Sequence, residues 1–317
     1  MRTDSDLATV RWNAGSLNNG LVFGLAYHLA RTLPRWCGYA VADTATWIAY
    51  KTLHSGTDAL LANLRVVCPH ASDHERHALA RLTYRTYARD TADFIRSLSM
   101  PPEKVAAMVT PRNHEQFDGL LARGRGVLLV GGHLGNWELG GVVLRQLHGC
   151  PLTVVVKAEA SPVVHAFRLR MREVLGIDTL EIGQTLDTAL RIRAQLSANR
   201  GVAMLLDRHV GRDSVEVQFF GRPASFLRTP AMIGLMSGAP LLPTFMLRQP
   251  GGHFVAQLGD AIFVDASIDR EDAVQRATQA FATQLEAQIR LYPHLWYQFY
   301  PYWPDDVPSG SHDGGAV

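Results

Sequence analysis

Short apolar runs alternate with longer amphipathic stretches from residue 126 onward, and this alternation constrains the fold more than any other feature. The runs "GVLLV", "LTVVV" and "GVAMLL", which begin at residues 126, 152 and 201, have the length of buried strands. Amphipathic stretches at 136–147, 162–175 and 185–198 separate them. Strands that alternate with helices in this way form a mainly parallel sheet with helices on its faces. The sequence therefore predicts an α/β fold.

The first hundred residues have a different texture and predict helices. Residues 16–68 are rich in apolar residues and contain few charges. A further helix is expected from the capping box of Ser72 and Glu75 to about Leu98, because apolar residues recur there at helical spacing. The chain is thus expected to have three parts, namely a helical subdomain that can contact a membrane at 1–110, an α/β core at 111–303 and a disordered tail at 304–317.

The last third of the chain predicts a hairpin and two helices. The segment "VEVQFF" alternates with the period of a strand, and a later hairpin is expected to turn between Gln249 and Gly252. Between them, "RTPAMIGLMSG" predicts a helix with Thr229 as its N-cap and Pro230 at its first position. Residues 269–291 predict a last long amphipathic helix.

The composition is that of a folded globular protein. The chain has 317 residues, of which 47% are hydrophobic and 19% charged, and its formal net charge of +2 gives no reason to expect nucleic acid as a partner. Only three of the 31 basic residues are lysines, which reflects either a GC-rich genome or binding of anions, since arginine presents a planar fork to phosphate. Three widely spaced cysteines argue against a disulfide framework or a zinc site and fit a reducing compartment.

The apolar N-terminal stretches predict contact with a membrane but no crossing of it. No signal peptide is visible, and no run reaches the roughly 18 apolar residues that a span requires. The nearest candidates, "LVFGLAYHLARTL" and "WCGYAVADTATWIAY", are interrupted by His28, Arg31 and Asp43. Seven aromatic residues between Tyr292 and Trp303 more often cover a core than form a membrane belt, but paired with these stretches they remain candidates for a bilayer interface.

The stretch "VLLVGGHLGNWELGG", residues 127–141, places a histidine and an acid on a glycine-rich corner directly after a predicted strand. The strand delivers His133 at its C-terminal end, and the glycines let the backbone turn sharply there. Asn136 can cap the following helix, which would carry Glu138 in its first turn. In open α/β sheets, ligands bind at the carboxyl ends of the strands. The corner is therefore a candidate functional site.

The residue types at this corner suit acid–base catalysis. A carboxylate beside an imidazole fixes the tautomer of the ring and stabilises its protonated form. We therefore expect His133 to act as a general base toward a hydroxyl group, with Glu138 as the acid that orients it.

Two other interpretations of the corner stay open at this point. It could be a capped turn with a solvated histidine, since roughly one His-x4-acid pair is expected by chance in this composition. His70 and Glu75 share the spacing, although the capping box already explains Glu75. A strand, glycines and a helix also suit a nucleotide phosphate. The glycines do not fit G-x-G-x-x-G, however, and no G-x-x-x-x-G-K-[ST], G-x-S-x-G or H-E-x-x-H motif is present.

The segment "GGHLGNWELGG" resembles the His-x4-Asp/Glu motif of the lipid A biosynthesis acyltransferases of the lauroyl/myristoyl type, whose relatives include the phosphatidylinositol mannoside acyltransferases. Further blocks resemble the family in the same order. "SPVVHAFRLRMREVLGI" places a family arginine at Arg172, and "GVAMLLDRHVG" places the aspartate that ends a family strand at Asp207. "VEVQFFGRPASFLRTPAMIGLMSGAPLLPTFMLR" is similar to a fourth block. One departure is His209, where the family often has a second acid.

The resemblance implies transfer of a fatty acyl chain from an acyl carrier protein or coenzyme A thioester to a hydroxyl of a lipid or glycolipid. It implies a glycerolipid acyltransferase-like α/β fold and peripheral attachment to the cytoplasmic face of the inner membrane. No metal, cofactor or covalent nucleophile is needed for this chemistry. The alternative is a non-catalytic lipid- or nucleotide-binding protein on the same fold.

The resemblance also assigns roles to residues. His133 and Glu138 are the expected catalytic pair. Arg172 and Asp207 are expected to act in binding or charge stabilisation. The full set expected to bind substrate is Asn136, Arg172, Asp207, Arg222 and Arg228, and the neighbouring Arg208 and Arg212 are further candidates to meet a phosphate.

Overall fold

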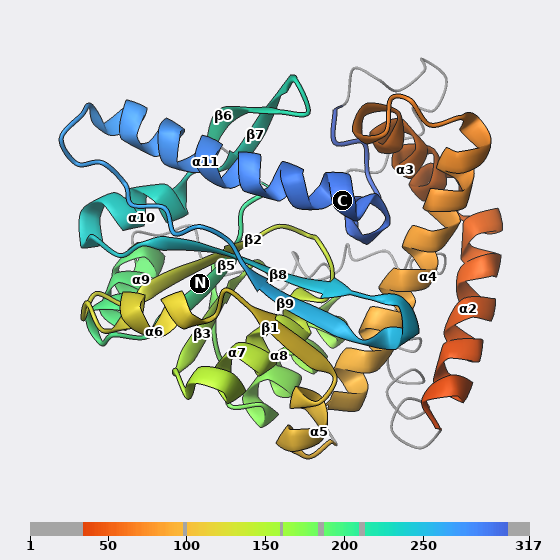
Figure 1. Ribbon diagram of the computed structural model, residues 1–317, viewed down its shortest axis with the longest axis horizontal. Coiled ribbons are helices and arrows are strands. Elements are labelled where there is room, and N and C mark those ends of the chain that lie inside the picture. Colours follow the sequence, from red (N-terminus) through yellow and green to blue (C-terminus); the bar gives the residue numbers. More distant parts are fainter. Residues whose placement is uncertain (1–33, 98–99, 159–160, 183–186, 209–212, 304–317) are drawn as a thin grey trace, which may run out of the picture.

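A seven-stranded sheet forms the centre of the protein (Figure 1). The computed structural model describes residues 34–97, 100–158, 161–182, 187–208 and 213–303. The strand order is β1-β9-β8-β2-β5-β3-β4. The bounds are β1 Val109–Arg112, β2 Val127–Gly131, β3 Leu152–Val156, β4 Asp178–Glu181, β5 Gly201–Leu205, β8 Leu241–Arg248 and β9 Phe254–Leu258. A separate antiparallel pair consists of β6 Ser214–Phe219 and β7 Arg222–Leu227.

The predicted mainly parallel sheet is confirmed. Strands β8, β2, β5, β3 and β4 run parallel to one another, whereas β9 is antiparallel to β8 and β1 is parallel to β9. The strands β1, β4 and β7 were not predicted. In β1 and β4 only one residue of four is buried, so neither strand contains the apolar run that marks the others.

Helices cover both faces of the sheet and form a group at one end of it (Figure 1). Helices α9, α10 and α11 lie on one face, α7 and α8 lie on the other, and α2, α3 and α4 pack together beyond the sheet. Their bounds are α2 Arg35–Thr52, α3 His54–Val67, α4 Asp73–Ser97, α5 Pro102–Ala106, α6 Glu115–Leu121, α7 Trp137–His148, α8 Pro162–Val174, α9 Asp187–Ser197, α10 Thr229–Ser237 and α11 Arg270–Leu291. Two short 3₁₀ helices are η2 Pro250–Gly252 and η3 Pro293–Leu295.

Strand β2 joins the two hydrophobic cores, because its successive side chains point to opposite faces of the sheet. Leu128 and Val130 pack with the core beneath α9, α10 and α11. Val127 and Leu129 pack with the core beneath α7 and α8. All five residues of β2 are buried, which is why this strand is a continuous apolar run in the sequence.

The local signals at helix ends and turns give mixed outcomes. The capping box is confirmed, since the Ser72 amide donates to Glu75 at 2.7 Å and the Glu75 amide donates to the Ser72 hydroxyl at 3.3 Å. The hairpin between β8 and β9 is also confirmed. The prediction that Thr229 is an N-cap is wrong. Thr229 is the first residue of α10, and its hydroxyl donates to the Asp213 carboxylate instead of capping the helix.

The predicted division of the chain stays a prediction. Helices α2, α3 and α4 share a small core of their own, built around Leu60, Leu64 and Tyr84. The predicted tail at 304–317 and the apolar stretch before residue 34 lie outside the described residues. Among the helices that the structure describes, none combines the length and the apolar character needed to cross a bilayer.

We predict that Gly135→Ala is far more destabilising than Gly124→Ala. Both glycines have positive φ, +67° and +70°, so alanine at either position incurs a left-handed strain of about 1–2 kcal/mol. At Gly135 a Cβ would also lie 2.0 Å from the carbonyl oxygen of Met246, whereas nothing lies within 4 Å at Gly124. Thermal unfolding followed by circular dichroism should show a small Tm loss for Gly124→Ala and a large one for Gly135→Ala. Equal losses would contradict the clash.

Candidate active site

His133 lies at the carboxyl edge of the sheet and contacts Asp207. Its Nδ1 is 2.7 Å from Oδ1 of Asp207, and its backbone amide donates to Oδ2 at 2.9 Å. His133 follows β2, and Asp207 follows the neighbouring parallel strand β5. The carboxyl ends of parallel strands meet at one edge of a sheet, so the two residues are adjacent although 74 positions separate them.

The expectation that Glu138 orients His133 is wrong. The carboxylate on the imidazole belongs to Asp207, for which we expected a role in binding or charge stabilisation. Glu138 instead accepts two hydrogen bonds from Arg172, one from Nε at 3.1 Å and one from Nη2. A guanidinium nitrogen of Arg168 also lies 3.9 Å from the Glu138 carboxylate. The first turn of α7 directs Glu138 toward α8, where two arginines satisfy it, while the aspartate after β5 is already placed beneath His133.

The buried Asp207 carboxylate accepts four hydrogen bonds. Besides the two from His133, Oδ2 accepts the indole N–H of Trp296 at 3.1 Å and the amide of Gln298 at 2.8 Å. Arg208 donates to the other side of that amide, at Oε1 of Gln298, which fixes its orientation. Burial alone would raise the pKa of Asp207, but its interaction with the His133 ring, the positive charge of Arg208 and the hydrogen bond from the His133 amide lower it to about 2.

The ionised carboxylate determines which tautomer His133 adopts. A carboxylate only accepts hydrogen bonds, so the ring proton lies on Nδ1, and Nε2 keeps its lone pair. Burial lowers the pKa of His133 and outweighs the opposing effect of Asp207. The positive charges of Arg208 and Arg168 lower it further. The imidazole is therefore neutral near pH 7, with an Nε2 that can accept a proton.

Residues 296–298, here called the strap, run beside the corner and were not identified from the sequence. The Tyr297 amide donates to the His133 carbonyl at 2.8 Å, and Trp296 pairs with Leu134 in an isolated bridge. Trp296 and Tyr297 are buried, as expected for aromatics that cover the core. No local pattern marks Gln298, because its partner Asp207 lies 91 positions away.

Asn136 acts as the N-cap of α7, as expected. Its side-chain oxygen accepts the Leu139 amide at 3.2 Å, and its side-chain nitrogen donates to the Asp90 carbonyl at 2.9 Å. The oxygen and the nitrogen of the buried Asn136 amide thus both make hydrogen bonds within the protein. This arrangement favours a structural role over the contact with substrate that we expected.

The predicted arginines separate into two groups. Arg172, Arg208 and Arg222 line the cavity that adjoins His133. Arg228 is absent from the described lining and pairs with Glu271 of α11, so the expectation that it binds substrate is not supported by its position. His209 and Arg212 lie outside the described residues.

A cavity of about 1920 Å³ opens beside His133 and extends between the sheet and α7. Apolar side chains from five strands line its sheet side, namely Leu129, Val154, Ala203, Met246 and Ala256. Helix α7 contributes Gly140, Gly141 and Leu144. Charged and polar groups gather where the strands end, around His133, Asp207 and Glu138. Within the described ranges, no group of three or more His, Cys, Asp or Glu side chains is placed to hold a metal ion.

Comparison with known sequences identifies the family. Residues 11–304 match the family described as bacterial lipid A biosynthesis acyltransferase. The phosphatidylinositol mannoside acyltransferase of Mycolicibacterium smegmatis is 25% identical over 288 residues, which cover 90% of this chain and 92% of that protein. Two enzymes of the same name from strains of Mycobacterium tuberculosis are 27% and 26% identical, over 90% of this chain and 88% of each relative. The chain therefore belongs to the bacterial lipid A biosynthesis acyltransferase family and is an acyltransferase.

Proposed function

We propose that the protein transfers a fatty acyl chain from a thioester to a hydroxyl group of a glycolipid acceptor, with His133 as the general base. The observation that carries this proposal is the neutral His133 ring, whose Nδ1 contacts Asp207. Its Nε2 is then left to accept a proton from a hydroxyl group in the adjoining cavity. The names of the relatives point to a mannosylated phosphatidylinositol as the nearest example of such an acceptor. The donor is the thioester of an acyl carrier protein or of coenzyme A.

The reaction needs one proton to move through His133. Nε2 removes the proton of the acceptor hydroxyl as its oxygen attacks the thioester carbonyl, and Asp207 stabilises the imidazolium that forms. The tetrahedral intermediate collapses, the C–S bond breaks, and the thiolate takes the proton back from Nε2. The products are an ester and a free thiol, and the enzyme returns to its starting state.

Arginines are better placed than the corner amides to stabilise the oxyanion. The backbone amides of His133, Gly135 and Asn136 already donate to Asp207, Leu295 and Met246. Arg208 and Arg168 line the cavity, and both are close enough to His133 to lower its pKa. Their charge both keeps the base neutral before reaction and favours the negative charge that develops on the carbonyl oxygen.

The apolar part of the cavity is the proposed site of the acyl chain. Two consecutive glycines of the motif helix, Gly140 and Gly141, leave space opposite the sheet. A Cβ on Gly141 would lie 3.3 Å from Leu152 and 3.7 Å from Ile177, which both line the cavity. These glycines thus widen the cavity one to two turns of α7 from His133.

Helix α2 is the proposed membrane contact, with the protein bound peripherally to the cytoplasmic face of the inner membrane. Trp36 and Trp47 are 72% and 57% exposed, and Val41 and Ile48 are exposed beside them. The charged group of Lys51 lies 4.2 Å from the Trp47 ring. Exposed tryptophans beside a basic group are typical of a helix that lies in the headgroup region.

We predict a graded loss of activity at the base and its carboxylate. His133→Ala should lower kcat by about 10²–10⁴-fold, because general-base catalysis contributes that much. Asp207→Asn should lower it by up to about 10⁴-fold, because an amide favours the wrong tautomer. These losses are measured as turnover of acyl thioester by variants whose folding is checked by circular dichroism.

The matched control for this series is His70→Ala, which alters the exposed histidine with the same spacing to an acid. It should leave turnover nearly unchanged. Glu138→Gln should be milder than Asp207→Asn, because Glu138 contacts Arg172 and not the base. A folded His133→Ala protein with near-normal turnover would show that the base assignment is wrong.

We predict that Gly141→Leu shifts the chain preference toward shorter acyl groups. The added side chain would project toward Leu152 and Ile177 and fill part of the cavity. Each methylene group of the acyl chain that is no longer buried costs about 0.8 kcal/mol of binding free energy. Exclusion of two methylene groups should therefore reduce the rate with long acyl chains roughly tenfold relative to short ones. Gly119→Leu on α6, where nothing lies within 4 Å, is the control. An unchanged ratio of rates for Gly141→Leu would place the chain elsewhere.

We predict that charge on α2 weakens membrane binding. Trp47→Glu should reduce partitioning onto phosphatidylglycerol-containing vesicles roughly tenfold or more, since burial of a large apolar side chain contributes about 1.5–3 kcal/mol. Met236→Glu on α10, another exposed apolar position, should have little effect. Vesicle sedimentation measures both, and fractionation should show release by high salt or mild detergent. Equal binding by the two variants would argue against α2 as the contact.

A further inference from the structure

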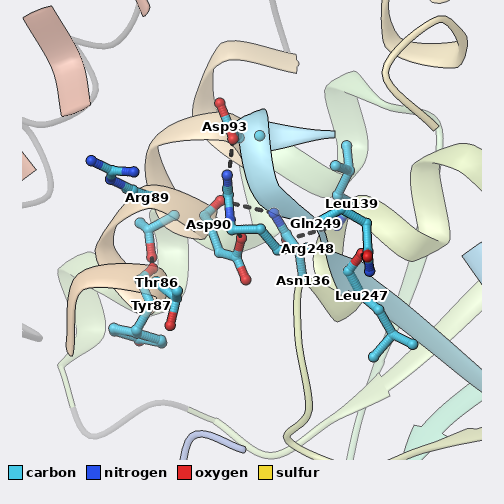
Figure 2. Close-up of polar contacts among 12 residues, drawn as sticks. Thr86, Tyr87, Arg89, Asp90, Asp93, Asn136, Leu139, Leu247, Arg248 and Gln249 are labelled. Atoms are coloured by element: carbon cyan, nitrogen blue, oxygen red, sulfur yellow. Dashed lines mark hydrogen bonds and ion pairs between the residues drawn. The ribbon is translucent and has the colours of Figure 1, made fainter. Parts of the chain in front are cut away.

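Two buried aspartates of α4 lie behind the active-site corner. Asp90 and Asp93 are only 4% and 2% exposed, and Figure 2 shows Arg248, the last residue of β8, beside them. Nε of Arg248 donates to Oδ1 of Asp90 at 2.6 Å, and its Nη2 donates to Oδ2 of Asp93 at 2.6 Å. One guanidinium thus joins both carboxylates to the sheet.

The buried charges of this cluster balance. Two carboxylates removed from water would cost several kcal/mol each if they were unpaired. Arg35 of α2 donates to both oxygens of Asp93, at 2.9 and 2.8 Å, so Asp93 has two cationic partners. Asp90 is contacted by the guanidinium of Arg248, and its ionisation therefore depends on that residue.

Asp90 contacts both halves of the active site. Its Oδ2 accepts the hydroxyl of Tyr297, the central residue of the strap, at 2.6 Å. Its backbone carbonyl accepts the side chain of Asn136, the cap of the helix that follows the His133 corner. Backbone hydrogen bonds also join this region to the corner, from the Tyr297 amide of the strap to His133 and from the Gly135 amide to Leu295, which precedes the strap. The Tyr297 hydroxyl attaches the strap to α4, in addition to the bonds that Arg208 donates to the Tyr297 carbonyl and Asn63 donates to the Gln298 carbonyl.

We propose that Asp90, Tyr297 and Arg248 are positioning residues of the acyl transfer reaction. Asp90, kept ionised by Arg248, fastens the strap through the Tyr297 hydroxyl, so that Trp296 and Gln298 hold Asp207 against Nδ1 of His133. These residues act through Asp207 and not on the substrate. The inference rests on the proposed role of His133 as the base.

The protonation of this pair agrees with the geometry. Burial and the charge of Asp90 raise the pKa of Tyr297 well above its usual value, so its hydroxyl remains a donor at neutral pH. Burial also raises the pKa of Asp90 to about 6, although Arg248 opposes the rise, so the carboxylate is mostly ionised at pH 7.

The test removes a single oxygen atom with Tyr297→Phe. The ring keeps its packing against Tyr87 and Trp137, so the variant should fold. We expect kcat to fall about 10- to 100-fold, because small misplacements of catalytic groups have effects of that size. KM should stay within about twofold, since the removed hydroxyl bonds Asp90 and the ring that lines the cavity is kept. The control is Tyr50→Phe, which removes a hydroxyl that bonds His77 between α2 and α4, away from the strap.

A proton magnetic resonance measurement reads the positioning without activity. The proton between His133 Nδ1 and Asp207 should give a signal downfield of the amides that is absent in His133→Ala and Asp207→Asn. Tyr297→Phe should shift or broaden this signal, and Tyr50→Phe should not. Arg248→Lys, which keeps a cation beside Asp90, should retain more activity and a sharper signal than Arg248→Met.

Two results separate this inference from the proposed function. A folded Tyr297→Phe protein with wild-type kcat and an unchanged signal overturns the positioning role. If His133→Ala retains turnover, the base assignment fails, but the signal still reports whether Asp90 and Tyr297 hold Asp207 on the imidazole.

Discussion

The buried carboxylate of Asp207 is the group on which the rest of the active site depends. An ionised carboxylate without partners in a protein interior costs several kcal/mol, and here four hydrogen bonds offset that cost. The donors come from the corner after β2 and from the strap near the end of the chain. Asp207 can therefore be buried in its ionised form only when the sheet, the corner and the strap have assembled.

Two carboxylates at one site have different tasks because their surroundings differ. Glu138 belongs to the His-x4-Glu motif, but the geometry of the first turn of α7 places it on Arg172. Asp207 belongs to another part of the sequence, but parallel pairing of β2 and β5 places it on His133. The motif thus combines the proposed base with a residue that contacts arginines lining the cavity, and the carboxylate on His133 is supplied by the neighbouring strand.

The cavity lies partly on the α7 face of the sheet and extends to the β6–β7 pair. On the face of α11, large aromatic side chains such as Phe219, Phe226 and Phe281 fill the core. On the face of α7, small residues at Gly140 and Gly141 leave a space lined by apolar atoms. The apolar part of this cavity has room for a chain whose reactive end would lie near His133.

Local periodicity and spacing were enough to predict the α/β class, the buried strand before His133, the Asn136 cap and the capping box of Ser72 and Glu75. These features involve residues a few positions apart, so spacing reveals them. Long-range packing, by contrast, places Asp207 on His133, Gln298 and Trp296 on Asp207, and Arg228 on Glu271. Strand order and helix packing set those contacts across tens of residues, and such distances leave no periodic trace in a single chain.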